Sequence, residues 1–261
     1  MAAGPGVGGT RFGAAADDYA VHRADFPSVG IDRMVALGVG TPGQRLLDLG
    51  CGTGTMARQF AARGCTVTGI DVDARMLAAG GALAESAGLD VSWRECPAED
   101  TGLESTSFDV VTAAQCWHWF NGDAAAAEVR RLLVPGGRVA VCGFDWLPLP
   151  GTVSGVTELL IQAHNPSWNL GGIRDPGPWA RRQLGGAGLV ELETFTFDVD
   201  VPYAVSSWRR RIGASAGILD LSAEAAAAFD VELAEVLADR FPGDDLLAPH
   251  RVWASVAVSP V

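Results

Sequence analysis

Apolar positions change their spacing near residue 45. Before that point, residues 13–38 carry apolar side chains at helical spacing in two stretches, separated by a break at Phe26-Pro27. After it, short apolar runs alternate with helical patterns, which is typical of a parallel sheet covered by helices on both faces. The runs predict strands at Arg45–Leu49, Thr66–Ile70, Asp90–Trp93, Phe108–Ala113 and Arg138–Gly143. The patterns between them predict helices at Thr55–Arg63, Ala74–Ala87 and Ala124–Leu133, with a turn at Pro135-Gly136-Gly137.

The regular alternation ends after Phe144. Residues 145–188 carry several prolines around one helical pattern at Val153–Ala163. Further along, the pattern predicts strands at Leu189–Val199 and His250–Val258, and helices at Ser206–Ile218 and Ala223–Arg240. We therefore predict a single domain over residues 13–261 with an elaborated second half, preceded by a disordered tail at residues 1–12.

Composition excludes several classes of function. The 261 residues are 48% hydrophobic and 19% charged, which is enough apolar material for a sizeable core. The net charge of −12 argues against a nucleic-acid surface, which is normally basic. The cysteines, five in number and without a Cys-x-x-Cys pair, favour a reducing cytoplasm over a disulfide framework or a zinc site, and no metal is expected. No apolar run has membrane-spanning length, and residues 1–12 lack a signal-peptide pattern.

The strongest chemical signal is a predicted strand that runs into a glycine-rich turn and then a helix. Gly50, Gly52 and Gly54 follow Asp48-Leu49, and glycine lets a backbone lie against a ligand where a Cβ would clash. Asp71 ends the next predicted strand, where a carboxylate can accept hydrogen bonds from two ribose hydroxyls. A dinucleotide site needs a wider glycine spacing, G-x-G-x-x-G, so an NAD-dependent oxidoreductase is disfavoured.

At this motif the sequence resembles the class I S-adenosylmethionine-dependent methyltransferases. The resemblance continues in Gly69–Asp73, Met76-Leu77, Ala98–Asp100, Ser107–Val111 and Leu132–Gly137. It implies an α/β fold: a doubly wound, Rossmann-like sheet of seven mostly parallel strands with an antiparallel last strand and a helical lid. It also implies S-adenosylmethionine as cofactor and S-adenosylhomocysteine as product. The residues that it assigns to cofactor binding along the sheet edge are Asp48, Gly50, Cys51, Gly52, Gly54, Asp71, Val72, Met76, Ala98, Glu99 and Gln115.

One position departs from the family pattern. Many relatives carry an aspartate before the Ala-Glu pair, where it can hold the adenine amino group, and this chain has Pro97. The resemblance then implies that Glu99 or backbone groups bind the adenine.

An aromatic run follows the fourth predicted strand. Gln115–Phe120 resembles the branch related to trans-aconitate and other small-molecule methyltransferases. His118 is the candidate catalytic base for an acceptor that must lose a proton, or a residue that hydrogen-bonds a backbone carbonyl beneath the aromatic cluster. Trp117 and Trp119 are either walls of the acceptor pocket or core, and at least one should be core.

The resemblance also extends to the N-terminal segment. Residues 13–38 resemble helices that close over the donor, with Tyr19 as a lid ring and Arg23 as partner of the donor carboxylate. The alternative is a surface helix whose arginine pairs with Asp17 or Asp18.

Relatives build the acceptor pocket from the second half of the chain, here residues 145–188 and 203–245. The candidates there are His164, Trp168, Trp208 and Arg209. Arg209 is the residue expected to recognise an acidic substrate through a two-pronged contact, whereas a solvated helix face is at least as good an interpretation for Arg210 and Arg211. The implied function is methylation of a small-molecule acceptor on oxygen, carbon or nitrogen, for example a biosynthetic intermediate or carboxylic acid. The alternatives are other donor-dependent chemistry, such as an intramolecular cyclisation, or a catalytically silent binding protein.

Overall fold

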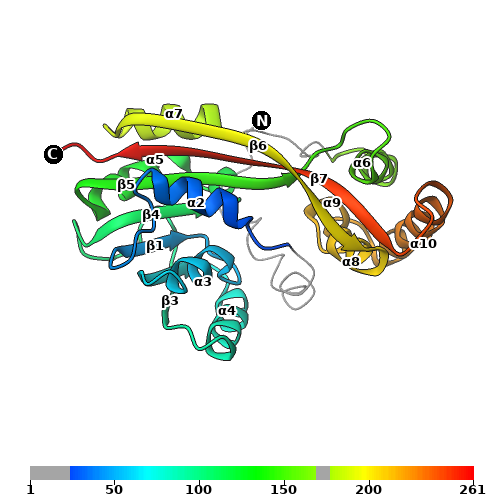
Figure 1. Cartoon of the computed structure of the whole chain (residues 1–261), viewed down its shortest axis with the longest axis horizontal. Coiled ribbons are helices and arrows are strands. Elements are labelled where there is room, and N and C mark those ends of the chain that lie inside the picture. The colour runs from blue at the N-terminus through cyan, green and yellow to red at the C-terminus, as the bar shows by residue number, and fades with distance from the viewer. Residues whose placement is uncertain (1–23, 169–176) are drawn as a thin grey trace.

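The computed structural model describes residues 24–168 and 177–261. Its strands are β1 (Arg45–Leu49), β2 (Thr66–Asp71), β3 (Val91–Glu95), β4 (Phe108–Ala114), β5 (Leu133–Trp146), β6 (Val190–Ala204) and β7 (Asp245–Val258). They form a seven-stranded sheet in the order β3-β2-β1-β4-β5-β7-β6 (Figure 1). Strands β1 to β5 pair in parallel, and β7 runs antiparallel to both β5 and β6. The predicted fold, mostly parallel with an antiparallel last strand, is confirmed.

Helices cover both faces of this sheet. They are α2 (Ser28–Ala36), α3 (Thr55–Ala61), α4 (Ala74–Ser86), α5 (Gly122–Leu132), α6 (Val153–His164), α7 (Gly177–Gly186), α8 (Val205–Gly213), α9 (Ala216–Leu219) and α10 (Ala223–Arg240). Successive strand residues point to opposite faces, so Leu47 and Leu49 pack with α5 and α7, whereas Leu46 packs with α2 and α3. Burial on both faces explains why the strands read as continuous apolar runs.

A third core cluster lies beyond the carboxyl end of β5. It joins Trp146 to side chains of α6, α8, α9 and α10 and to the start of β7. Figure 1 shows these helices grouped at one end of the long strands β5 to β7. We call α6, α8, α9 and α10 the helical cap: α6 follows β5, and α8 to α10 are an insertion between the paired strands β6 and β7. The cap therefore sits at the sheet edge where open α/β sheets bind ligands.

The structure corrects several predicted boundaries. Helix α7 was not expected, because prolines and glycines obscure the helical pattern there. The helix predicted at Ser206–Ile218 is divided into α8 and α9. The predicted turn at Pro135-Gly136-Gly137 is instead a bulge inside β5, where the pairing with β4 shifts and Gly136 has φ 75°. Strand β6 extends past its predicted end and carries the chain into the cap, and β7 begins before its predicted start and carries the chain back out.

The second half of the expected lid is part of the scaffold. Ile31 and Met34 of α2 are fully buried and belong to the core cluster that α3 and β7 share. Tyr19 and Arg23, which carry the lid hypothesis, lie outside the described residues.

Within the ranges that the structure describes, no helix combines the length and the hydropathy needed to cross a bilayer. The same ranges hold no group of three or more His, Cys, Asp or Glu residues placed to bind a metal ion.

Candidate active site

The glycine-rich turn joins β1 to α3 at the carboxyl edge of the sheet. Gly50, Gly52 and Gly54 all have left-handed torsions, with φ of 55°, 55° and 76°. Space is restricted as well as torsion. A Cβ added at Gly50 would lie 2.8 Å from Cβ of Cys116, and one at Gly54 would lie 2.3 Å from the Trp93 ring. Only glycine fits this turn, which leaves its backbone open to a ligand.

Asp71, at the end of β2, holds this turn in place. Its Oδ2 accepts a hydrogen bond from the backbone N–H of Gly52 at 2.9 Å, and its Oδ1 accepts one from Asp73 at 3.0 Å. Burial raises the pKa of this half-buried carboxyl group. A carboxylate has about four acceptor positions, so acceptor capacity remains for the two hydroxyls of a ribose.

An apolar surface follows this carboxylate. Val72, the next residue, is 47% exposed, which is high for a large apolar side chain at the end of a buried strand. Met76 lies beneath the turn, with its methyl carbon 3.2 Å from where a Cβ on Gly52 would be. Met76 is itself buried, at 5% exposure, so Val72 is the exposed apolar side chain beside the turn and the carboxylate.

Two residues of the expected cofactor set lie behind the turn. Asp48 is 1% exposed, and its Oδ1 accepts a hydrogen bond from the Thr112 hydroxyl at 2.8 Å. Burial raises its pKa to about 7, against the opposing effect of hydrogen bonds from Thr112 and the backbone of Ala57. Burial also raises the pKa of the Cys51 thiol, which donates to the carbonyl of Gly52 at 3.7 Å. Contrary to the expectation of direct cofactor binding, Asp48 lies in the protein interior, where it stabilises the base of the glycine turn.

The loop after β3 is fastened to α5. Ala98 is buried in the core, and Oε1 of Glu99 accepts a hydrogen bond from the backbone N–H of Asn121 at 2.7 Å. Asn121 is the N-cap of α5. One oxygen of Glu99, the side chain left for adenine in the absence of an aspartate at Pro97, is therefore committed to the scaffold.

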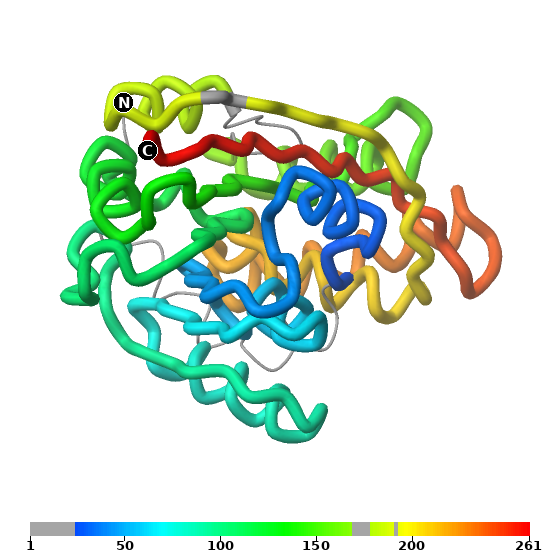
Figure 2. The backbone as a smooth tube through the Cα atoms, turned by 60° about the vertical axis from the view of Figure 1, so that its left-hand side comes forward, coloured from blue at the N-terminus to red at the C-terminus, as the bar shows by residue number. Residues whose placement is uncertain are grey.

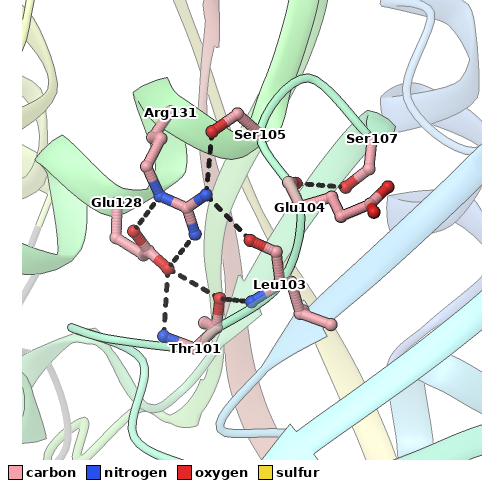
Figure 3. Close-up of polar contacts among 7 residues, drawn as sticks. All are labelled: Thr101, Leu103, Glu104, Ser105, Ser107, Glu128 and Arg131. Carbon is pink, nitrogen blue, oxygen red and sulfur yellow. Dashed lines mark hydrogen bonds and ion pairs between the residues drawn. The ribbon is translucent and has the colours of Figure 1, made fainter.

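An ion pair between the buried Glu128 and the partly exposed Arg131 holds the same loop further along (Figure 3). Glu128 of α5 accepts two hydrogen bonds from Thr101, from its N–H at 3.0 Å and its hydroxyl at 2.6 Å. Arg131 donates to both oxygens of Glu128 at 2.7 Å, and also to Leu103 and Ser105. Arg131 is the main reason why the pKa of Glu128 is lowered to about 2, and Thr101 adds to the effect. Sequence analysis did not identify this network, whose members come from two separate segments.

Gln115 connects the ends of two strands. Its backbone is left-handed, with φ 56°, a conformation that non-glycine residues adopt rarely and often near functional sites. Its Nε2 donates to the carbonyl of Phe144 at 2.6 Å and to Oδ1 of Asp145 at 2.8 Å. The side chain that was expected to bind cofactor thus also fixes the end of β5.

The aromatic run after β4 is divided between core and surface. Trp117 is 3% exposed, and its Nε1 donates to Gln183 of α7 at 2.8 Å. It is therefore core, which confirms that at least one of the tryptophans is and excludes Trp117 from the pocket wall. Trp119 is half-buried, and the exposed His118 ring lies 4.7 Å from it. Exposure argues against a histidine beneath the aromatic cluster.

Two tryptophans expected in the acceptor pocket belong to the interior of the cap. Trp208 is fully buried, and its Nε1 donates to the hydroxyl of Thr157 on α6 at 3.0 Å. Trp168 donates to Oε1 of Glu158 at 2.8 Å. Both indole nitrogens are thus used to fasten segments of the cap to α6, which corrects the substrate role given to Trp208.

The charged acceptor candidates are also engaged within the cap. Arg209 binds Asp230 of α10 through two nitrogens, at 2.9 and 2.5 Å. Its two-pronged contact is therefore made inside the protein and not to a substrate. Nε2 of His164 lies 2.8 Å from Oε2 of Glu232, also on α10. The two pairs connect α8 and α6 to α10.

A different arginine from the predicted Arg209 lies inside the cap. Arg211 is 8% exposed and lies on the inner face of α8 with Trp208 and Ile212. The signal was present, because the spacing of 208, 211 and 212 puts the three residues on one side of a helix. A charged residue at a core position of that pattern marks a special environment.

Comparisons with known proteins agree with this geometry. Residues 47–141 match the profile of the family described as "Methyltransferase domain". A ubiquinone biosynthesis O-methyltransferase of Pseudomonas savastanoi pv. phaseolicola is 36% identical over 191 residues, covering 66% of this chain and 81% of that protein. An uncharacterized methyltransferase of Mycobacterium tuberculosis is 34% identical over 149 residues, covering 57% of this chain but only 56% of that protein.

Among solved structures, the fold resembles phosphoethanolamine N-methyltransferase 2 of Haemonchus contortus in complex with phosphomonomethylethanolamine and S-adenosylhomocysteine. The TM-score is 0.60 at 21% identity, over 98% of this chain and 61% of that one. At this identity the similarity concerns the fold alone. Together, the sheet order, the latched glycine turn and the match to the Pseudomonas enzyme show that the chain belongs to the class I S-adenosylmethionine-dependent methyltransferases.

Proposed function

We propose that this chain transfers a methyl group from S-adenosylmethionine to a small-molecule acceptor. The observation that carries the proposal is the glycine turn held by the hydrogen bond to Asp71, which puts a backbone without side chains beside a carboxylate at the end of the neighbouring strand. When bound, the cofactor supplies an activated methyl group on a sulfonium with a neutral leaving group. The protein's part is then to bind, orient and exclude water, and positioning alone can contribute roughly 7–11 kcal/mol.

Oxygen is the acceptor atom that we favour over carbon and nitrogen. The similarity to an O-methyltransferase of ubiquinone biosynthesis supports this choice. An oxygen acceptor must lose a proton, and an exposed imidazole at the carboxyl end of β4 is suited to receive it. We therefore retain His118 as the proposed base.

The finer assignments belong to the same proposal. The proposal assigns the chain to the branch of methyltransferases that includes trans-aconitate-type enzymes. The His-Trp-Phe sequence after β4 supports this assignment. Tyr19 and Arg23 close over the donor as a lid. The acceptor is small and is not a nucleic acid, supported by the net charge of −12. The cysteine pattern supports the cytoplasm as the compartment.

Binding and product analysis test this function. We expect calorimetry to show binding of S-adenosylhomocysteine and no binding of NAD. Gly52→Val should abolish donor binding, whereas Gly88→Val should preserve it, because Gly88 also has a left-handed φ but has nothing within 4 Å of an added Cβ. Failure of the wild-type chain to bind S-adenosylhomocysteine would overturn the proposal.

The released product distinguishes the alternatives. Incubation with S-adenosylmethionine and a panel of phenols and carboxylic acids should release S-adenosylhomocysteine in proportion to methylated acceptor. Conversion of an acceptor without any S-adenosylhomocysteine would instead support cofactor-dependent cyclisation. Donor binding without conversion of any acceptor would support a silent binding protein.

A further inference from the structure

Arg211 is a buried cation without a carboxylate partner in the described parts of the chain. It is 8% exposed, and its guanidinium carbon lies 5.0 Å from the centre of the Trp146 ring. Among residues 24–168 and 177–261 it forms no ion pair, in contrast to Arg209 two positions earlier. A buried charge that lacks a partner is strongly destabilising, so its presence calls for a functional explanation.

A second buried polar group lies beside this cation. Tyr203, at the end of β6, is 7% exposed, and apart from its contact with Arg211 its hydroxyl has no hydrogen-bond partner within the described residues. Its ring packs edge-on against Trp208 at 5.1 Å and stacks with His250 at 6.0 Å. The Arg211 guanidinium and the Tyr203 hydroxyl thus both lie among the rings of Trp146, Trp208 and His250.

The carboxylate of Asp145 attracts the arginine without forming a salt bridge with it. Asp145 accepts a hydrogen bond on Oδ1 from Gln115 at 2.8 Å and one on Oδ2 from Trp253 at 3.3 Å. Burial lowers the pKa of Arg211, and the charge of Asp145 and the contact with Tyr203 offset this effect. The cluster therefore keeps the capacity to bind one more negative charge.

The cluster adjoins the edge that binds the donor. Trp146 and Asp145 end β5, and Gln115, which follows β4, connects them to the strand beside the glycine turn. In open α/β sheets, ligands bind outside the carboxyl ends of the strands. A molecule held at Arg211 would thus lie on the acceptor side of the same edge.

We propose that Arg211 and Tyr203 form the carboxylate-binding part of the acceptor pocket, and that the acceptor is a flat aromatic acid whose ring packs beside Trp146, the ring that Arg211 already contacts. This inference rests on the proposed methyl transfer. A guanidinium binds a carboxylate through two parallel hydrogen bonds, and the tyrosine hydroxyl donates a third. A single cation balances a carboxylate but leaves a phosphate dianion with excess buried charge, so the carboxylate is favoured.

Thermal unfolding and calorimetry with benzoate test this subsite, using the full chain saturated with S-adenosylhomocysteine. The matched variants are Arg211→Met and Arg210→Met, which make the same change at a buried and at an exposed position of one helix. Benzoate should raise the Tm of the wild type and of Arg210→Met, whereas the neutral isostere benzamide and phenyl phosphate should not. Arg211→Met should lose the benzoate response, and Tyr203→Phe should bind benzoate about tenfold more weakly.

A second readout separates a binding site from a structural role. Without benzoate, Arg211→Met should unfold at a higher temperature than the wild type, because the variant removes an uncompensated buried charge. A lower Tm, or equal benzoate affinity in wild type and Arg211→Met, would overturn the inference. So would an equal response to benzamide or phenyl phosphate. If Arg211→Met does not fold, Arg211→Lys serves instead, and weaker benzoate binding with unchanged S-adenosylhomocysteine affinity supports the subsite.

The two proposals fail in different ways. If the wild type does not bind S-adenosylhomocysteine, the proposed function is wrong. If it binds S-adenosylhomocysteine but shows no response to benzoate, the proposed function stands and the carboxylate subsite is wrong.

Discussion

The carboxylate of Asp71 accepts a hydrogen bond from the backbone N–H of Gly52 at 2.9 Å, so a side chain at the end of β2 fixes the glycine turn that follows β1. Under the proposed function the same carboxylate binds the ribose, which couples cofactor affinity to the conformation of the turn. Loss of this carboxylate would then remove a ligand contact and also release the loop that forms the rest of the proposed site.

This coupling predicts a graded response to substitution at Asp71. Asp71→Ala should weaken S-adenosylhomocysteine binding roughly 10- to 100-fold, since a hydrogen bond to a charged group contributes about 1.5–3 kcal/mol. Asp71→Asn should weaken it less, because the amide oxygen still accepts from Gly52. Calorimetry measures both. The control is Asp109→Ala, which breaks the pair with Arg45 at the opposite end of β1 and should leave affinity unchanged. Unchanged affinity in folded Asp71→Ala would contradict the ribose assignment.

Two glycines with left-handed φ allow the stability cost of backbone strain to be compared with the cost of steric overlap. Gly136 has φ 75° and nothing within 4 Å of an added Cβ, so Gly136→Ala should lose about 1–2 kcal/mol of stability from backbone strain alone. At Gly50 the added Cβ also meets Cys116 at 2.8 Å. Gly50→Ala should therefore lose more stability and should also impair donor binding. Urea unfolding and calorimetry of the two variants give the comparison, and equal losses would show that the Cys116 contact relaxes freely.

Ionisation of Glu128 makes the free energy of unfolding depend on pH under acidic conditions. Its pKa is lowered to about 2 in the folded chain, mainly by Arg131, from an ordinary value of 4.5. Its contribution is therefore present above about pH 4.5 and is lost as the pH falls toward 2. Arg131 is 37% exposed, and solvent screening reduces the expected contribution to about 1–2 kcal/mol at neutral pH.

Glu128→Gln tests this linkage. Urea unfolding at pH 7 should show the variant to be less stable, and the difference should shrink as the pH falls below 4.5. Glu104→Gln, an exposed residue on the same loop, should follow the wild type throughout. A difference between wild type and Glu128→Gln that is constant with pH would mean that charge is not the source of the stabilisation.

His118→Gln should lower turnover while leaving S-adenosylhomocysteine affinity nearly unchanged. A general base typically contributes about 10²–10⁴-fold, and the wild-type rate should rise with pH as the imidazole loses its proton. The variant should lose that rise. His164→Gln, which alters the histidine paired with Glu232 in the cap, should keep it. A rate independent of pH between about 6 and 9 in the wild type would instead indicate an acceptor that needs no base.

The donor half of the molecule was predictable because its determinants are contiguous. The strand, the glycine turn and the helix start follow one another directly, and Asp71 ends the next strand. The cap differs because its side chains find partners far along the sequence. Arg209 is paired with Asp230, and Trp117 with Gln183 on a helix that glycine and proline obscured. The spacing puts Arg211 on one helix face with Trp208 and Ile212, and the packing of α8 turns that face into the cap.

The position of β7 between β5 and β6 has a consequence for how the protein is made. Figure 2 shows β7 running between these two strands, yet β7 follows both of them in the sequence. During synthesis β6 therefore emerges from the ribosome before the strand that anchors it to the sheet. The donor edge, built from β1 to β5, can assemble in the meantime. Tyr203, Arg211 and His250, from β6, α8 and β7, come together only when β7 inserts. A chain truncated before β7 should therefore keep the proposed cofactor site and lack the proposed acceptor subsite.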